Sequence, residues 1–169
     1  MQRSGSPPGI KLREATLADV DRLLELLVAV AGEGRWIGTE APVDLERRRQ
    51  RMVEDVEGAS AIVLVAEVDG VPVGELGLQL ARYGVADLGM LVAAGWRGRG
   101  VGTALLVEAI GRARAAGAHK LALQVWPHNT AAVALYEKFG FEREGYLRRH
   151  YRRRSGELWD ALIMGLPLD

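Results

Sequence analysis

One stretch of the sequence, Val85 to Gly117, constrains the fold more than any other. It begins with an apolar run to about Val92 that is typical of a buried strand. A glycine-dense turn follows, and apolar residues then return at helical spacing until Gly117, which suits the end of a helix. These apolar residues are Leu105, Leu106, Ala109, Ile110 and Ala113. A strand, a glycine-rich turn and a helix N-terminus can hold a diphosphate, because glycines let the backbone come close and the first helical N–H groups lack partners.

The spacing within this turn excludes two common phosphate-binding motifs. A Walker loop needs a Lys after its second glycine, and no Lys occurs between Lys11 and Lys120. The dinucleotide fingerprint needs a third glycine where this chain has Thr103. The pattern that remains is Arg97-x-x-Gly100-x-Gly102. The hexapeptide by itself is equally compatible with a structural glycine turn between solvated arginines.

The composition excludes several classes of function. The chain has 169 residues, enough for one domain with its own core, and its 22 basic side chains balance 22 acidic ones. This balance argues against nucleic-acid or acidic-membrane partners. The chain has no Cys, so a disulfide and a cysteinyl acyl-enzyme are both excluded, and its three His lack metal-ligand spacing. With no signal peptide and no apolar run of membrane-spanning length, we expect a cytoplasmic protein without a metal.

The other patterns predict one domain over residues 10–169 after a leader, residues 1–9, that is rich in Gly, Ser and Pro and expected to be disordered. Apolar runs and turn signals predict strands over residues 10–14, 61–68, 71–80, 85–92, 120–126, 142–152 and 158–166. Helical spacing predicts helices after residues 16–19, after residue 44 with its Glu46-to-Arg49 side outward, and over residues 101–117 and 129–139. The order β-α-α-β-β-β-α-β-α-β-β predicts an α/β protein with a mixed sheet and helices on both faces.

A second motif follows the first by about thirty residues. It reads Asn-x-x-Ala-x-x-Leu-Tyr-Glu-Lys-x-Gly-Phe, and a helix through it places Asn129, Ala132 and Tyr136 on one side. The two motifs and the order of elements together resemble the GNAT superfamily of acyl-CoA N-acetyltransferases, whose phosphate signature is Q/R-x-x-G-x-G/A. The resemblance covers nearly all of the chain past Gly9 and implies the GNAT fold.

The resemblance also implies an activity. Acetyl-CoA, as co-substrate, would give its acetyl group to a primary amine of a small molecule or a peptide N-terminus by direct attack in a ternary complex. Backbone groups at the end of the central strand would bind pantetheine and polarise the acetyl carbonyl, loop amides would hold the pyrophosphate, and the second motif would line the far side of CoA. In that order, these residues are Leu91 and Val92; Arg97, Gly98, Arg99, Gly100, Val101, Gly102 and Thr103; Asn129, Ala132 and Lys138.

The candidate catalytic groups are Tyr136, Glu75 and Asp87. Tyr136 occupies the position whose phenol protonates the departing thiolate in the family. Alone it would be an ordinary amphipathic tyrosine on the core-facing side of a helix, but the flanking motif favours the catalytic role. Some relatives carry a glutamate base where this chain has Gln124, which cannot accept a proton usefully. Glu75 or Asp87 could act as the general base directly or through water, or be ordinary exposed strand carboxylates.

Other features leave alternatives open. The basic run Arg148 to Arg154 is interpreted as a strand with a solvated arginine face. Trp36 lies in a loop that borders the acceptor site in relatives, and it could bind substrate or cap the core. The C-terminal hairpin resembles that of relatives that modify ribosomal-protein N-termini, polyamines and small amines and that often dimerise there, so a homodimer is expected. The alternative functions are a non-catalytic CoA-binding module on the same fold and a nucleotide-phosphate binder.

Overall fold

The computed structural model describes residues 9–169, so most of the predicted leader lies outside the described residues. The elements are β1 (Lys11–Glu14), α1 (Val20–Gly32), α2 (Leu45–Glu57), β2 (Ala61–Val68), β3 (Val71–Leu80), β4 (Val85–Val92), α3 (Val101–Ala115), β5 (Lys120–Val125), α4 (Thr130–Lys138), β6 (Glu142–Arg152) and β7 (Leu158–Pro167). Short 3-10 turns precede α1 and α3. This order confirms the predicted one. Within residues 9–169 no helix is both long and apolar enough to cross a membrane.

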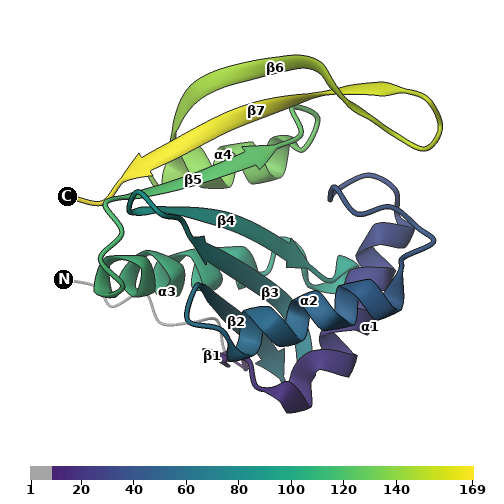
Figure 1. Ribbon diagram of the computed structural model, residues 1–169, viewed down its shortest axis with the longest axis vertical. Coiled ribbons are helices and arrows are strands. Elements are labelled where there is room, and N and C mark those ends of the chain that lie inside the picture. Colours follow the sequence, from purple (N-terminus) through teal and green to yellow (C-terminus); the bar gives the residue numbers. More distant parts are fainter. Residues whose placement is uncertain (1–8) are drawn as a thin grey trace.

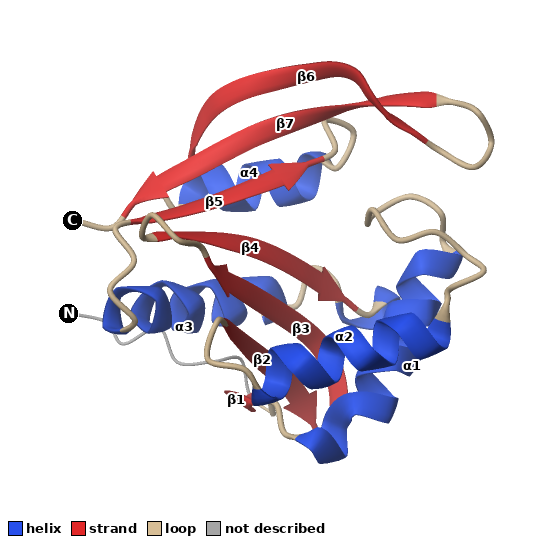
Figure 2. Cartoon of the chain, in the orientation of Figure 1, coloured by secondary structure: helices blue, strands red, loops and turns tan. Residues whose placement is uncertain are grey.

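One mixed sheet of seven strands organises the molecule, in the order β1-β2-β3-β4-β5-β7-β6. Neighbouring strands are antiparallel except β4 and β5, which are parallel. Helices α3 and α4 pack on one face over the larger apolar core, and α1 and α2 cover the other face over a smaller one (Figures 1 and 2). The predicted fold class, helices on both faces of a mixed sheet, is therefore confirmed.

Local sequence chemistry explains where several elements begin and end. Asp69 and Gly70 both have positive φ, 49° and 76°, which is the geometry of a tight hairpin between β2 and β3. Asp44 caps α2 by accepting a hydrogen bond from the Arg47 N–H at 3.1 Å, and Asn129 caps α4 in the same way. Gly117, with φ +82°, follows α3 in the left-handed conformation common after a helix.

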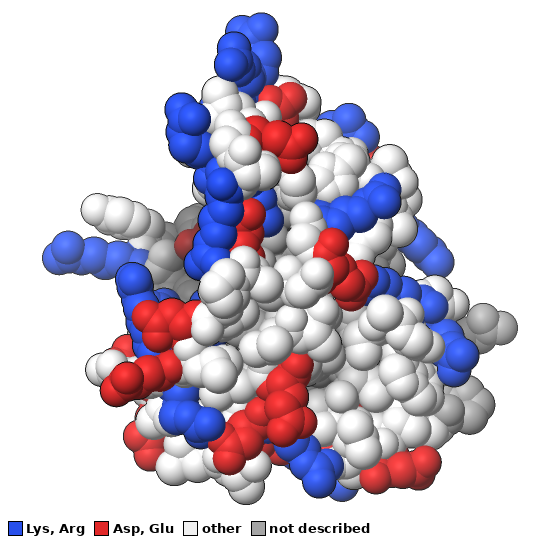
Figure 3. Space-filling model, turned by 90° about the vertical axis from the view of Figure 1, so that its right-hand side faces the viewer, with Lys and Arg blue, Asp and Glu red and all other residues white. Residues whose placement is uncertain are grey.

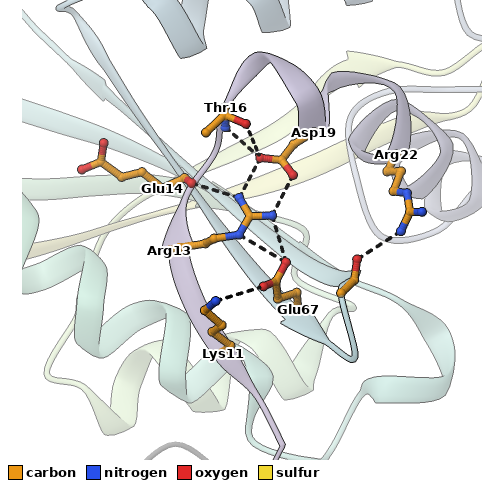
Figure 4. A network of polar contacts seen from close by, with 8 residues as sticks. Lys11, Arg13, Glu14, Thr16, Asp19, Arg22 and Glu67 are labelled. Carbon is orange, nitrogen blue, oxygen red and sulfur yellow. Dashed lines mark hydrogen bonds and ion pairs between the residues drawn. The ribbon is translucent and has the colours of Figure 1, made fainter.

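A cluster of charged side chains fixes the first strand to the start of α1 (Figure 4). The Arg13 guanidinium donates to both carboxylate oxygens of Asp19, at 2.7 and 2.8 Å, and to Glu67 of β2 at 2.9 Å. Asp19 also accepts the backbone N–H of Thr16 at 2.7 Å. The hydrogen bond from Arg13 is the main reason that the pKa of Asp19 falls to about 2. This cluster sets the direction in which α1 leaves the sheet.

The sheet opens between its two parallel strands. β4 pairs with β5 only over its first three residues, Val85 to Asp87, whereas it stays paired with β3 as far as Val92. Figure 1 shows β4 and β5 starting side by side and diverging toward their C-terminal ends. The C-terminal half of β4 therefore has a neighbour on one side only, and this opening positions the candidate site.

Candidate active site

A groove of about 1270 Å³ occupies the opening between β4 and β5 and extends over the sheet to α2. It brings together most of the site residues predicted from the sequence. Those that line it are Glu75, Asp87, Leu91, Val92, Arg97, Gly98, Gly100, Val101, Gly102, Thr103, Asn129, Ala132 and Tyr136. Two predicted residues do not line it: Arg99 stacks its guanidinium on Trp96, 5.0 Å from the ring centre, and Lys138 is exposed on α4.

The edge of β4 presents a row of backbone groups to this groove. Val85 accepts a hydrogen bond from Ala81, and Ala93 donates one to Val73, with an unbroken β3–β4 register between them. Because backbone groups alternate sides along an antiparallel strand, the N–H and C=O groups of Met90 and Val92 point away from β3 and into the opening. The Leu91 side chain lines the groove, but its backbone faces β3.

Part of this backbone row is already used. The Val92 carbonyl accepts a hydrogen bond from Arg97 Nε at 3.1 Å. Within residues 9–169 the remaining groups, the Val92 N–H and both groups of Met90, have no strand partner because β5 has diverged. Such an edge is suited to an extended ligand that carries amides of its own. Met90 is not among the residues predicted from the sequence, because its role depends on where the pairing between β4 and β5 stops.

The turn after β4 forms an anion cradle. Gly98 and Gly100 have φ values of +71° and +85°, which residues with a side chain rarely adopt. The first helical bond of α3 runs from the Ala104 N–H to the Gly100 carbonyl, so the three amides between them have no acceptor within the helix. Both features favour a diphosphate at this end of the groove.

Gly102 has a second reason to be glycine. A Cβ at this position would come within 3.0 Å of Leu135 on α4 and 3.4 Å of Met90 on β4. The motif glycines therefore serve the packing of α3 as well as the approach of a ligand, and the interpretation as a structural glycine turn is partly right.

Tyr136 lies at the buried side of the groove, with 6% of its surface exposed. Its ring packs on Phe141 at 5.4 Å between centres, and its hydroxyl makes no hydrogen bond within residues 9–169. Burial raises the pKa of the phenol to about 12. Tyr136 is thus both a core residue and a protonated hydroxyl beside the groove.

Glu75 and Asp87 lie on the sheet face that α1 and α2 cover. Glu75 is half-buried on β3 and stands opposite Leu91. Burial raises its pKa to about 7, although the positive charge of Arg48 opposes this shift. Asp87 is exposed, at the last β4 residue that pairs with β5. The interpretation as an exposed strand carboxylate is therefore wrong for Glu75 and right for Asp87.

The loop between α1 and α2 is tied to the anion cradle by Arg97. Its two terminal nitrogens donate to the Glu33 carboxylate at 2.7 and 2.8 Å, and Trp36 Nε1 donates to the same carboxylate at 2.8 Å. The hydrogen bond from Arg97 is the main cause that lowers the pKa of Glu33. The Arg97 guanidinium also lies 5.4 Å from the centre of the half-buried Trp36 ring. The Arg97 side chain thus contacts protein, and only its backbone is left for a ligand.

The predicted solvated arginine face is wrong at Arg153, which is 6% exposed. This side chain donates to the carbonyls of Gly38 and Ile37 at 3.1 and 3.4 Å. Its guanidinium lies over the rings of Trp126 and Trp159, at 5.3 and 4.3 Å from their centres. Arg153 therefore fastens the β6–β7 hairpin to the loop after α1, on the open side of the groove.

Three other groove residues, Arg47, Arg48 and Arg51 of α2, were missed. The Glu46-to-Arg49 side of α2 is exposed, as predicted, and its Arg47 and Arg48 line the open groove. Arg48 and Arg51 share a helix face with Asp55, at spacings of three and seven, and this pattern could have indicated a common surface. The tip of the β6–β7 hairpin and the loop between α1 and α2 project toward the face that Figure 3 shows. Positive and negative side chains are interspersed on that face.

The site has a polar mouth and no visible metal-binding cluster. Gln124, aligned with the glutamate of some relatives, lines the groove and accepts a hydrogen bond from the Tyr151 hydroxyl. Among residues 9–169 no group of three or more His, Asp or Glu side chains is placed to hold a metal ion.

Comparisons with known proteins agree with this geometry. An L-methionine sulfoximine/L-methionine sulfone acetyltransferase of Pseudomonas paraeruginosa is 28% identical over 163 residues, covering 94% of each chain. The crystal structure of a ribosomal-protein-alanine N-acetyltransferase from Brucella melitensis has a TM-score of 0.85 and 33% identity, covering 94% of this chain and 99% of that one. The protein yncA of Salmonella typhimurium, solved with its cofactor acetyl-CoA, shares the fold, with a TM-score of 0.82, 24% identity and 95% coverage of both chains. The acetyltransferase (GNAT) family profile matches residues 23–141, so this chain belongs to that family of acetyl-CoA-dependent N-acetyltransferases.

Proposed function

We propose that this chain transfers the acetyl group of acetyl-CoA to a primary amine, of a small molecule or a peptide N-terminus, by direct attack in a ternary complex. The observation that carries the proposal is the unpaired edge of β4, which leads directly into the amide cradle at the start of α3. An extended amide chain that ends in a diphosphate matches this sequence of donors and acceptors.

The proposed cofactor site uses mainly backbone groups. Met90 and Val92 bind the pantetheine amides and offer N–H donors to the acetyl carbonyl, where negative charge develops during attack. The amides from Gly98 to Thr103 hold the pyrophosphate, and Asn129 and Ala132 form the opposite wall. The Leu91 side chain adds apolar contact. The side chains of Arg99 and Lys138 take no part in the proposed site.

Two side chains move protons in the proposed reaction. Acetyl-CoA supplies an activated thioester, but an alkyl ammonium has a pKa of about 10 and must lose a proton before it can attack. Glu75 accepts this proton, directly or through water, because its pKa of about 7 lies near the working pH of a cytoplasmic enzyme. Tyr136 donates its phenolic proton to the sulfur as the C–S bond breaks and the C–N bond forms. Asp87 is the second candidate base.

The alternative is a CoA-binding module without chemistry, and one observation favours it. Gln124 stands where some relatives are expected to carry a glutamate base, and its carboxamide is engaged by Tyr151. Glu75 would then be a half-buried carboxylate without a catalytic task.

A panel of amines separates the two functions. Amino acids, their amides, polyamines and short peptides are incubated with acetyl-CoA, and free thiol and acetylated amine are measured together. We expect thiol release that depends on the amine and equals the acetylated product. If acetyl-CoA stabilises the protein but thiol is released with none of the amines, the chain is a CoA-binding module instead.

The homodimer expected from the resemblance stays a prediction.

A further inference from the structure

We propose that the acceptor carries an anionic group, a carboxylate or a close analogue of one, beside its amine, and that Arg48 of α2 binds that group. The inference rests on the proposed function and names the substrate class of the same site. Its evidence lies in the half of the groove farthest from the anion cradle, between the sheet and α2.

The floor of this half is backbone. Gly77 of β3 and Gly89 of β4 are paired opposite each other, and a Cβ at either position would meet no atom of the described residues within 4 Å. Glu75 and Asp87 lie on the same face, on either side of this pair, because strand residues two apart share a face. A small ligand can thus lie directly on the sheet, with its amine between two carboxylates.

Most charges around this floor already have partners. The Asp55 carboxylate accepts a hydrogen bond from Gln79 Nε2 at 2.9 Å and forms an ion pair with Arg51 at 3.3 Å. Glu40 forms an ion pair with the buried Arg153 at 3.4 Å and accepts the backbone N–H of Arg154. These pairs define the walls of the groove and are not open to a ligand without cost.

Three arginines line the groove without a side-chain partner. Within residues 9–169 the guanidinium groups of Arg47, Arg48 and Arg154 make neither a hydrogen bond nor an ion pair. Of these three, Arg48 is the one whose charge acts on Glu75. It is close enough to Glu75 for its charge to oppose the upward shift of that carboxyl's pKa. Arg49, the next residue, is turned to the far side of α2 and pairs with Asp21 of α1.

The available charges are therefore cations on α2, of which Arg48 is the one near Glu75, and carboxylates on the sheet below them. A zwitterion with adjacent ammonium and carboxylate groups complements both at once, and a guanidinium binds a carboxylate with two parallel hydrogen bonds. A polyamine would bring a second cation toward Arg48, and a peptide N-terminus has a neutral amide where the carboxylate belongs. The polyamine is disfavoured by charge repulsion, and the peptide N-terminus is disfavoured because it leaves the charge of Arg48 without a partner.

The test compares each free amino acid with its own amide. L-methionine, L-leucine, L-phenylalanine and L-glutamate, each with the matching amide, and spermidine are assayed with acetyl-CoA. For the wild-type chain we expect a higher kcat/KM for the free acid than for the amide. In Arg48→Gln the ratio of the two should fall by about 10- to 100-fold, since a charged hydrogen bond is removed from one substrate only.

Two variants serve as controls. Arg48→Lys keeps the charge but not the two parallel hydrogen bonds and should lie between the wild type and Arg48→Gln. Arg49→Gln removes an arginine from the other side of the same helix and should keep the wild-type ratio.

The outcomes are distinct. Efficient acetylation of amides or spermidine, with free acids poorer, would overturn the inference and leave the proposed function standing. An equal loss for acid and amide in Arg48→Gln would also overturn it, because Arg48 would then act on the fold or on acetyl-CoA. No transfer to any acceptor would overturn the proposed function and this inference with it.

Discussion

Tyr136 holds its proton for a physical reason that is independent of any relative. Its phenol is almost fully buried in the larger core, and burial disfavours the phenolate, which raises the pKa to about 12. At neutral pH the group is therefore a hydroxyl ready to donate. The same packing on Phe141 that buries the ring also fixes its direction.

Replacing Tyr136 by Phe keeps this packing and removes only the donor. We expect kcat to fall on the order of 10²-fold, the usual contribution of a general acid, while the affinity for acetyl-CoA changes little. Steady-state kinetics and calorimetry of the variant measure the two quantities. Turnover at the wild-type rate would remove Tyr136 from the mechanism.

The raised pKa of Glu75 predicts how the rate of the reaction depends on pH. With its pKa raised to about 7, the protonated carboxyl prevails at lower pH and cannot accept a proton, so kcat/KM should decline below about pH 7. Arg48 and Asp55 of α2 are the charged groups that act on Glu75: Arg48 lowers its pKa and Asp55 raises it. Glu75→Gln should lose activity at every pH, whereas Asp87→Asn should keep the acidic decline in whatever activity it retains. The reverse pattern would make Asp87 the base.

The stability of Glu75→Gln provides a control that does not need substrate. Because the folded-state pKa lies above the ordinary value of 4.5, the folded chain binds this proton more tightly than the unfolded chain, and ionised Glu75 destabilises the fold above about pH 7. The variant should therefore be more stable than the wild type at pH 8, by up to about 3 kcal/mol, and not at pH 4. Thermal unfolding at both pH values tests this, and a destabilised variant at pH 8 would contradict it.

At the scale of elements, the cradle before α3 is open to a charge test. Gly98 has φ +71°, and no atom lies within 4 Å of its missing Cβ, so Asn and Asp, which tolerate this conformation best, are both suitable replacements. Gly102 is less suitable, because a side chain there would press on Leu135. Gly98 is therefore the better position for a substitution.

Gly98→Asp places a carboxylate at the proposed pyrophosphate site, and Gly98→Asn is the isosteric neutral control. We expect the Asp variant to bind CoA about 10-fold more weakly than the Asn variant at low salt, since like charges repel there. The difference should shrink as salt is added. Equal affinities in calorimetry would mean that the diphosphate lies elsewhere.

The start and the middle of the loop after α1 are held by arginines from distant parts of the chain. Arg97 fixes Glu33 next to the cradle, and Arg153 fixes Gly38 and Glu40 against the β6–β7 hairpin. This loop lies over the open side of the groove, and both arginines use their side chains to hold it. The half of the groove beside α2, where we propose that the acceptor binds, thus depends on Arg97, which belongs to the turn that forms the anion cradle.

For the whole molecule, the sequence predicted the fold well because its signals are local. Asp69-Gly70 and Gly117 identify a hairpin and a helix end, and several strands have the predicted bounds. The cradle was predicted for the same reason. Arg153 was not, because its partner Gly38 lies 115 residues away in the sequence. Met90 and Arg48 depend on where β5 leaves β4 and on how α2 lies over the sheet, which no local pattern records.

The central claim is that the opening between β4 and β5 binds acetyl-CoA through backbone groups. Titration of the full chain with acetyl-CoA, CoA and ATP in a calorimeter tests it most directly. We expect one molecule of acetyl-CoA or CoA to bind per chain, and ATP to bind far more weakly, because it has phosphates for the cradle but no pantetheine arm for β4. No heat with acetyl-CoA, or equal affinity for ATP, would contradict the account.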